Sequence, residues 1–249
     1  MIDIDKRFQE AAQYFWSDRS KQRNKQLLGG RSDAGQRASV TGGTQMSAFE
    51  ALVSDVLIDA GLDRLHIKTR TSLELPGYYR PEKRWDLVVV SGETLVAAIE
   101  FKSQVGPSFG NNFNNRSEEA IGSASDIWVA FREGRFTTAS APFLGYFFLL
   151  EDCPRVWSPV RNREPYFQVD PVFAGEGNEK SVSVGVSYVS RYQVLCKRLV
   201  MERLYTASCL TLATNAKPTV VSHPAEDLSF KRFAAALQGH VVTFLGGIR

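Results

Sequence analysis

The feature that most constrains the fold is an apolar segment, residues 85–103, that carries three charges at regular positions. Two runs of β-branched and other apolar residues flank a Gly-containing break at 91–93, a pattern typical of an antiparallel hairpin. Side chains alternate along a strand, and a three-residue loop pairs residues whose numbers sum to an even value. Asp86, Glu100 and Lys102 are therefore predicted to share one face of the hairpin.

Two interpretations of this face are open. Many half-exposed strands direct Asp, Glu and Lys to solvent, and the three charges would then form a solvated face. The other hairpin positions are almost all Leu, Val, Ala or Ile, which favours burial on both sides. Buried like charges repel and raise each other's pKa unless a cation neutralises them. The pattern therefore favours a site for a divalent metal beside a phosphate.

Size and composition set the broad class. With 249 residues, 43% of them hydrophobic, the chain can bury a sizeable core. It has no uncharged apolar run long enough for a membrane span, and its charged N-terminus argues against secretion. Three scattered cysteines fit neither a disulfide framework nor a zinc site, so a reducing cytoplasm of a prokaryote is the expected location. Three widely spaced histidines argue against a His-based metal site or triad.

The distribution of charge says more than the net charge of +3. Residues 18–37 hold six basic side chains against two acidic ones, and two smaller basic groups follow later in the chain. Such clusters are usually solvated faces. Beside a pair of carboxylates they make a phosphate-rich partner more plausible. The basic residues are Arg19, Lys21, Arg23, Lys25, Arg31 and Arg37, then Arg155, Arg161 and Arg163, then Arg191, Lys197 and Arg198.

Periodicity predicts alternating helices and strands along the chain. In order, we expect a helix at 5–28, a loop at 29–43 without the order of a P-loop, a helix at 47–60 ended by Gly61, a strand at 66–75 ended by Pro76–Gly77, and the hairpin. There follow a Gly- and Asn-rich loop at 106–116, a helix at 117–133 capped by Ser117, with Ala120, Ile121, Ala124, Trp128 and Phe131 inward, and a central strand at 143–150. The remainder reads as an irregular segment at 152–182 and helices at 188–205 and 228–245.

The order helix, three strands, helix and strand, with Asp on the second strand and Glu-x-Lys on the third, resembles the core of the PD-(D/E)XK nuclease superfamily. Trp85 stands where that superfamily often has Pro, a departure that leaves the metal-ligating carboxylates in place. The resemblance implies an α/β fold with a mixed central sheet flanked by helices and with additional N- and C-terminal helices. It also implies one domain over residues 1–249, with a catalytic core at about 46–150.

Flanking motifs narrow the resemblance to one family. Leu-Pro-Gly-Tyr-Tyr-Arg-Pro at 75–81, Glu-Phe-Lys-Ser-Gln-Val-Gly-Pro-Ser-Phe-Gly-Asn-Asn-Phe-Asn-Asn-Arg at 100–116, Glu-Glu-Ala-Ile-Gly at 118–122 and Leu-Tyr-Thr-Ala-Ser at 204–208 resemble the XhoI family of type II restriction endonucleases. This likeness spans about residues 40–208. It implies Mg²⁺-dependent hydrolysis of double-stranded DNA at CTCGAG with 5′ overhangs, and a cognate DNA methyltransferase as functional partner.

The residues fit that chemistry. Asp86 and Glu100 would hold Mg²⁺, which prefers oxygen ligands, and the backbone carbonyl of Phe101 could add a third ligand. Lys102 would orient the attacking water or stabilise charge at phosphorus. We prefer this electrostatic role to a general base because an unperturbed lysine has a pKa of about 10.4, and neighbouring carboxylates favour its charged form.

A further acidic ligand is expected from the first core helix, where Glu50 and Asp55 are the candidates. Either is otherwise an ordinary carboxylate on a helix surface.

Sequence readout in the major groove uses Arg on guanine and Asn or Gln on adenine. The alternative for the Asn-rich run is a turn that uses Asn for its backbone tolerance. The candidate DNA-contacting residues are Asn111, Asn112, Asn114, Asn115 and Arg116, with Gln104, Ser108, Arg161 and Arg163 as weaker ones.

A palindromic target matches a two-fold dimer, so a homodimer is expected. Other functions stay open, namely another PD-(D/E)XK nuclease with different specificity, such as a repair enzyme, and a non-catalytic DNA-binding protein. The intact charged trio argues against loss of catalysis. A glycoside hydrolase with two carboxylates would not call for a lysine two residues after the second.

Overall fold

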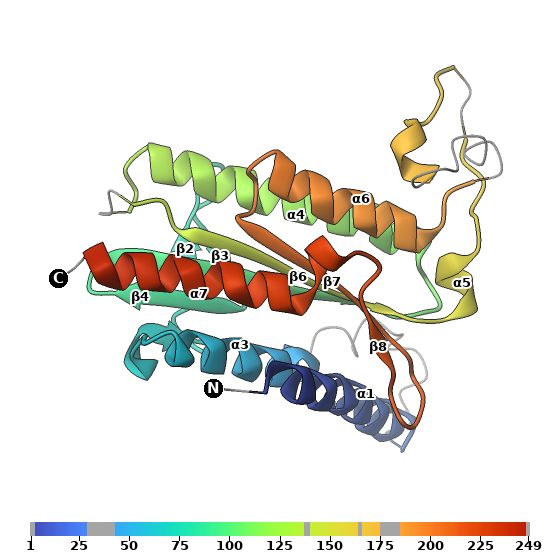
Figure 1. The fold of residues 1–249 in the computed structure, drawn as a ribbon. Coiled ribbons are helices and arrows are strands. Elements are labelled where there is room, and N and C mark those ends of the chain that lie inside the picture. Colours follow the sequence, from blue (N-terminus) through green and yellow to red (C-terminus); the bar gives the residue numbers. More distant parts are fainter. Residues whose placement is uncertain (1–2, 29–42, 137–139, 164–165, 175–184, 248–249) are drawn as a thin grey trace.

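The fold is a mixed six-stranded sheet with helices on both faces (Figure 1). The computed structural model describes residues 3–28, 43–136, 140–163, 166–174 and 185–247. The sheet order is β1 (Ile67–Lys68), β4 (Leu87–Ser91), β5 (Thr94–Gln104), β6 (Phe143–Glu151), β7 (Ala207–Ala213) and β8 (Val221–Ser222). Strands β5, β6 and β7 are parallel, whereas β1, β4 and β8 pair with their neighbours in antiparallel fashion. A separate two-stranded ribbon consists of β2 (Glu74–Pro76) and β3 (Glu82–Arg84).

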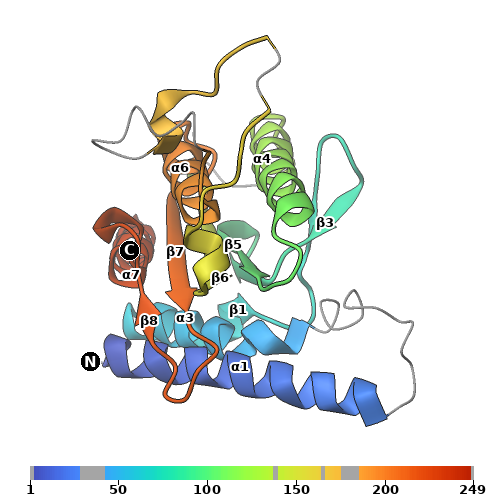
Figure 2. The same ribbon diagram turned by 90° about the vertical axis from the view of Figure 1, so that its right-hand side faces the viewer.

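Helices α4 (Gly110–Arg132) and α6 (Tyr188–Met201) cover one face of the sheet. Helices α1 (Ile4–Leu28), α3 (Ser47–Asp59) and α7 (Phe230–Gly247) cover the other (Figures 1 and 2). Each face has its own cluster of buried apolar side chains. The short helices are η1 (Gly43–Met46), η2 (Arg64–His66), α5 (Pro154–Trp157), η3 (Pro171–Ala174) and η5 (Glu226–Leu228). No helix in the described ranges is both long and apolar enough to cross a membrane.

Several predicted elements are confirmed. Strand β6 lies between β5 and β7, and all its residues except the last are buried, which explains its continuous apolar sequence. Helices α1, α3 and α7 occupy the predicted segments to within two residues, and Gly61 ends α3 with φ +98°. The predicted loop at 29–43 falls almost wholly outside the described residues.

The hairpin itself was predicted with the correct face but the wrong turn. The strands close between Ser91 and Thr94, so the loop has two residues rather than three. A bulge then adds one residue to β5, so that Val89 pairs with Ala97. From that pair onward, the residue numbers of paired positions again sum to an even value, as predicted. Asp86 therefore lies on the predicted face because a bulge compensates for the shorter turn.

Four other predictions are corrected. The strand expected at 66–75 is two short strands in different sheets, separated by a turn in which Ser72 has φ +59°. Helix α4 begins at Gly110, so the Asn-rich run is its first turns, and the Ser117 hydroxyl donates to the Phe113 carbonyl inside the helix instead of capping it. Ile121, expected inward, is 45% exposed.

The fourth correction concerns the C-terminal third. Helix α6 ends at Met201, and Arg203 takes φ +56°, so β7 begins where the predicted helix was ending. The sequence between them lacks Gly and Pro, and nothing local marks the break. Strands β7 and β8 were not predicted. The segment expected to be irregular, 152–182, contains α5 and η3, and its residues 164–165 and 175–182 lie outside the described part.

Candidate active site

The hairpin β4–β5 brings the three predicted charges together. The Phe101 amide donates to Asp86 Oδ2 over 2.7 Å, which fixes the aspartate at the start of β4. Lys102 Nζ lies 2.8 Å from Glu100 Oε1. These residues face the side of the sheet that α4 and α6 cover, because Ala98, two residues before Glu100, packs in that cluster.

Glu100 is the most deeply buried charge of the group, with 2% of its surface exposed. Lys83 Nζ lies 3.2 Å from the same Oε1 that Lys102 contacts. The Tyr205 hydroxyl donates to Oε2 over 3.2 Å. Burial by itself would raise the pKa of Glu100, but Lys102 and Lys83 lower it below its ordinary value. Glu100 is therefore an ionised carboxylate held by two ammonium groups and a phenol.

Asp86 and Glu50 carry less compensated charge. Burial raises the pKa of Asp86, although the Phe101 amide and Lys102 act in the opposite direction. Burial and then the negative charge of Asp86 raise the pKa of Glu50 to about 7. Glu50 in α3 is thus close enough to Asp86 for the two carboxylates to repel each other.

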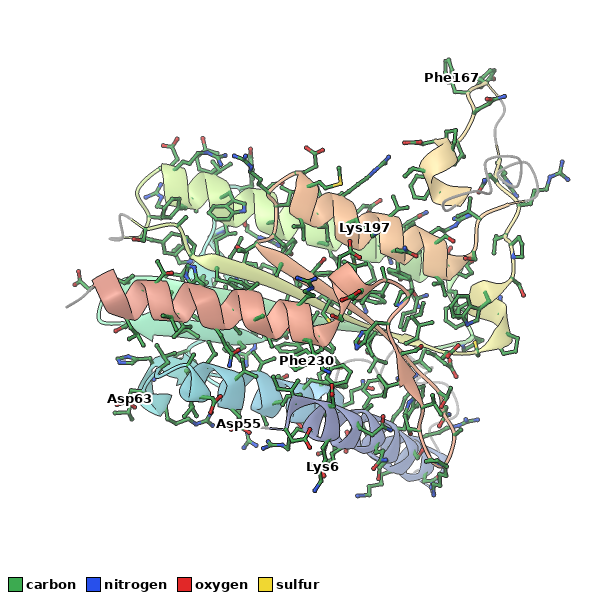
Figure 3. The ribbon with its side chains drawn as sticks, viewed as in Figure 1. Lys6, Asp55, Asp63, Phe167, Lys197 and Phe230 are labelled. Atoms are coloured by element: carbon green, nitrogen blue, oxygen red, sulfur yellow. The ribbon has the colours of Figure 1, made fainter. Side chains whose placement is uncertain are left out.

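The two candidates for a further acidic ligand are separated by the fold. Asp55 forms an ion pair with Arg7 of α1, and it lies on the side of α3 away from the sheet (Figure 3). Glu50, five residues earlier on α3, is the candidate that interacts electrostatically with Asp86. Asp55 is an ordinary surface carboxylate, as the alternative interpretation held.

The donor set suits a hard divalent cation. Two carboxylates and the Phe101 carbonyl would supply oxygen, and a cation would offset the burial, and the smaller repulsion between carboxylates, that raise the pKa of Asp86 and Glu50. In the described residues, no group of three His, Cys, Asp or Glu side chains could hold a metal ion by itself. The remaining ligands would have to be waters and a substrate phosphate, as is usual for Mg²⁺.

Sequence reasoning missed Lys83, Tyr205 and Glu119. Lys83 belongs to a charged Glu-Lys-Arg run that resembles a solvated strand, and Tyr205 is the last residue of the helix predicted at 188–205. Glu119 Oε2 lies 3.8 Å from Lys102 Nζ and 2.6 Å from an Arg116 nitrogen. No local pattern marks these three residues, because Lys83 comes from the separate β2–β3 ribbon, Glu119 from α4 and Tyr205 from the segment between α6 and β7.

The β2–β3 ribbon, which carries Lys83, is anchored to α4 by Asp126. The Tyr78 and Tyr79 amides each donate to Asp126 Oδ1 over 2.8 Å, and Arg80 Nε donates to Oδ2 over 2.7 Å. Gly77 at the ribbon tip leaves room for this contact, since an added Cβ would lie 2.5 Å from Asp126 Oδ2. The ribbon lies beside α4 in Figure 2.

The predicted DNA-contacting residues have different positions. Gln104 was predicted as a weaker DNA-contacting residue, but its side chain lies in the interior. It is 2% exposed, donates to the Ser108 and Phe109 carbonyls over 3.2 and 2.8 Å and accepts from the Tyr192 hydroxyl. These bonds hold the loop before α4 and leave the Gln104 side chain inside the protein.

The other candidates lie nearer the surface. The Asn112 amide donates to the Ser108 carbonyl over 2.6 Å, and Arg116 is partly buried against Glu119. The exposed candidates are Ser108, Asn111, Asn114 and Asn115 around the start of α4, and Arg161 and Arg163 in the segment after α5. That segment continues to Phe167, which projects from the molecule and is 87% exposed (Figure 3).

Comparison with known proteins identifies the family. The family model of restriction endonuclease XhoI matches residues 25–223. The chain belongs to the XhoI restriction endonuclease family. Its type II restriction enzyme relatives include BstVI of Geobacillus stearothermophilus, which is 44% identical over 227 residues, 88% of this chain and 96% of that protein.

Two further relatives have similar identity. The type II restriction enzyme XhoI of Xanthomonas vasicola is 47% identical over 174 residues, 69% of this chain and 66% of that protein. The type II restriction enzyme AbrI of Azospirillum brasilense is 43% identical over 198 residues, covering 77% and 89% of the two chains. No solved structure matches the chain significantly.

The chain is thus a type II restriction endonuclease, a site-specific deoxyribonuclease whose substrate is DNA. Enzymes of this class generally need a divalent metal. The matched range, 25–223, contains the two acidic neighbours Glu50 and Asp86, and Glu100 with its partners Lys83, Lys102 and Tyr205, whereas α7 follows it. The charged cluster therefore lies within the region that matches the family model.

Proposed function

We propose that the enzyme hydrolyses double-stranded DNA at CTCGAG with Mg²⁺, leaving 5′ overhangs, and that the cluster around Glu100 is its active site. The observation that carries this proposal is the buried Asp86–Glu100–Lys102 arrangement at one end of the hairpin. The element order α3, β1, β4, β5, α4 and β6 supports a PD-(D/E)XK core. The proposal takes residues 1–249 as one domain, with the catalytic core at about 46–150.

Asp86 and Glu100 would hold the metal, with the Phe101 carbonyl beside them and Glu50 as a further acidic group. When bound, the divalent metal supplies positive charge to the scissile phosphate and favours attack by water. The similarity to the type II restriction enzyme XhoI and to its family supports the proposed target, and the class of enzyme supports the metal.

Lys102 would act by its charge. Burial alone would lower the pKa of Lys102, but Glu100 and then Asp86 raise it above its ordinary value. The side chain therefore keeps its proton and is unsuited to be a general base. Its ammonium group would orient the attacking water or stabilise the negative charge that develops at phosphorus.

Sequence recognition and assembly complete the proposal. The exposed asparagines at the start of α4, Asn111, Asn114 and Asn115, follow directly from the catalytic strand and are suited to contact base edges or phosphates. A homodimer would present two copies of this surface to the halves of a palindrome. A cognate methyltransferase would protect the cell's own sites.

A plasmid with a single CTCGAG site tests the proposal. We expect linearisation with Mg²⁺, none with EDTA, and none of a control plasmid in which one base pair of the site is changed. Sequencing the ends would give the overhang, and sedimentation would give the oligomeric state. Cleavage of both plasmids would refute the proposed target, and intact DNA under every condition would refute the proposed active site.

A further inference from the structure

Two ammonium groups share one oxygen of Glu100. Lys102 Nζ and Lys83 Nζ lie 2.8 and 3.2 Å from Oε1, while the Tyr205 hydroxyl occupies Oε2. Both hydrogen-bonding positions on Oε1 are therefore taken by ammonium groups. A divalent cation that takes Oε1 as a ligand has to replace one of the two lysines.

The two lysines cannot both stay. A divalent cation at Oε1 would stand within a few ångströms of two positive charges in a site where Glu100 is only 2% exposed, and like charges repel strongly where water is scarce. Lys102 is two residues from Glu100 on the same strand and has Glu119 as a second acidic neighbour at 3.8 Å. These features favour Lys102 as the group that remains.

Lys83 has other partners to which it can move. It comes from the separate β2–β3 ribbon, and its side chain is 14% exposed. Its ammonium lies 4.2 Å from the centre of the Trp85 ring and 3.3 Å from the Arg84 carbonyl oxygen. A cation can stay over an aromatic ring when its carboxylate partner is taken, and a DNA phosphate would offer it a new anion.

We propose that Lys83 is a further active-site residue. Its ammonium neutralises Glu100 Oε1 when no metal is bound, and it would pass to a DNA phosphate when the metal and DNA bind. This inference rests on the proposed metal site at Asp86 and Glu100. The metal then binds weakly to the enzyme alone and more tightly with DNA, and by linkage the metal strengthens DNA binding equally.

Calorimetric titration with Ca²⁺, a cation that also takes oxygen ligands, measures the first consequence without turnover. The proteins are wild type, Lys83→Met, Lys83→Arg and Glu100→Gln, all without DNA. Lys83→Met removes the competing charge, and we expect it to bind Ca²⁺ at least about tenfold more tightly than wild type. Lys83→Arg keeps the charge and should resemble wild type, and Glu100→Gln should not bind.

Controls separate this effect from a change in folding. Lys231→Met alters an exposed lysine of α7 that pairs with Asp5, outside the site, and should leave Ca²⁺ affinity unchanged. Thermal unfolding by circular dichroism compares the stability of all variants. Lys83→Gln, a second neutral variant, should reproduce the tighter binding of Lys83→Met.

The second consequence concerns DNA. With Ca²⁺ present, binding of a fluorescent CTCGAG duplex is measured at several salt concentrations. If Lys83 reaches a phosphate, the slope of log K against log salt should fall by about 0.9 in Lys83→Met for each copy that makes the contact. The Lys231→Met slope should equal that of wild type.

The failures are distinguishable. Equal Ca²⁺ affinity in wild type and Lys83→Met, with binding lost in Glu100→Gln, would overturn the role of Lys83 and leave the metal site standing. An unchanged salt slope in Lys83→Met would overturn its transfer to phosphate. Absence of Ca²⁺ binding in every protein, with and without DNA, would overturn the metal site and the inference together.

Discussion

Two buried acidic groups of this enzyme, Asp126 under the β2–β3 ribbon and Asp86 in the hairpin, have opposite electrostatics. Asp126 is 3% exposed and Asp86 is partly buried, and burial raises the pKa of each. For Asp126, the amides of Tyr79 and Tyr78 and the side chain of Arg80 outweigh burial, and its pKa lies below the ordinary value. For Asp86, the Phe101 amide and Lys102 do not outweigh burial, and its pKa stays above the ordinary value.

The difference separates a carboxylate whose charge is compensated by hydrogen bonds from one whose charge is compensated less completely. Each oxygen of Asp126 accepts an N–H, so adding a cation would gain little. Asp86 has one recorded donor among the described residues, and its neighbour Glu50 adds further negative charge. Glu100 is intermediate between these two carboxylates. Its negative charge is balanced by the ammonium groups of Lys83 and Lys102, which a cation can displace.

The variant with the largest expected effect replaces Glu100, the carboxylate at the centre of the charged cluster. Glu100→Gln keeps the shape and the Tyr205 contact but removes the charge that would hold the metal. We expect DNA cleavage to fall by at least about 10³-fold, because a principal electrostatic group is lost. Single-turnover cleavage of the CTCGAG plasmid measures the effect. Near-normal cutting by a folded Glu100→Gln protein would remove Glu100 from the metal site.

Asp126→Ala should affect stability instead. It removes the acceptor of two backbone amides and of Arg80, at a cost of about 2–3 kcal/mol in the free energy of unfolding. The melting temperature should fall by about 5 °C. Thermal unfolding followed by circular dichroism measures it, with Asp55→Asn as an exposed control. A protein with unchanged stability would show that the ribbon does not depend on this anchor.

Glu50 and Asp55 form a matched pair on α3. Glu50→Gln should reduce cleavage by about tenfold through weaker metal binding, whereas Asp55→Asn should leave it unchanged, because Asp55 contacts Arg7 outside the site. Cleavage rates at subsaturating and saturating Mg²⁺ measure this, and the deficit of Glu50→Gln should shrink as Mg²⁺ rises. An equal loss of cleavage in both variants would contradict the assignment of Glu50, rather than Asp55, to the metal site.

The pH dependence of stability is a second readout for Glu50. Its pKa in the folded enzyme is about 7, against an ordinary 4.5, so the folded state holds a proton that the unfolded chain releases between these values. The contribution of Glu50 to stability therefore becomes unfavourable as pH rises from about 4.5 to 7. Without metal, the free energy of unfolding of Glu50→Gln minus that of wild type should therefore be larger at pH 8 than at pH 5. Parallel stability curves would contradict the raised pKa.

Tyr205→Phe should have the smallest effect. The hydroxyl donates to Glu100 Oε2 and also lies 3.1 Å from the Ala120 carbonyl, so it orients the carboxylate without contacting substrate. We expect cleavage to fall by up to about tenfold, with a higher Mg²⁺ requirement and a normal fold. The Mg²⁺ dependence of the rate separates this role from a structural one. An unchanged Mg²⁺ requirement would show that the bond does not position Glu100.

The local sequence was sufficient for the hairpin and for most of the regular elements. Alternation placed Asp86, Glu100 and Lys102 on one face, and helical spacing located α1, α3 and α7. Even so, the face was right only because a bulge corrected the two-residue turn. The end of α6 and strand β7 were missed since no Gly or Pro separates them.

Sequence by itself determined the family and the chemical character of the site, because the motifs at 75–81 and 100–116 and the period-two charges are local patterns. Only the tertiary structure decided that Glu50 rather than Asp55 adjoins Asp86, that Gln104 is interior, and that Lys83 and Tyr205 converge on Glu100. These contacts join residues on separate elements. Local periodicity carries no information about them, since they form only when the ribbon, the helices and the sheet pack together.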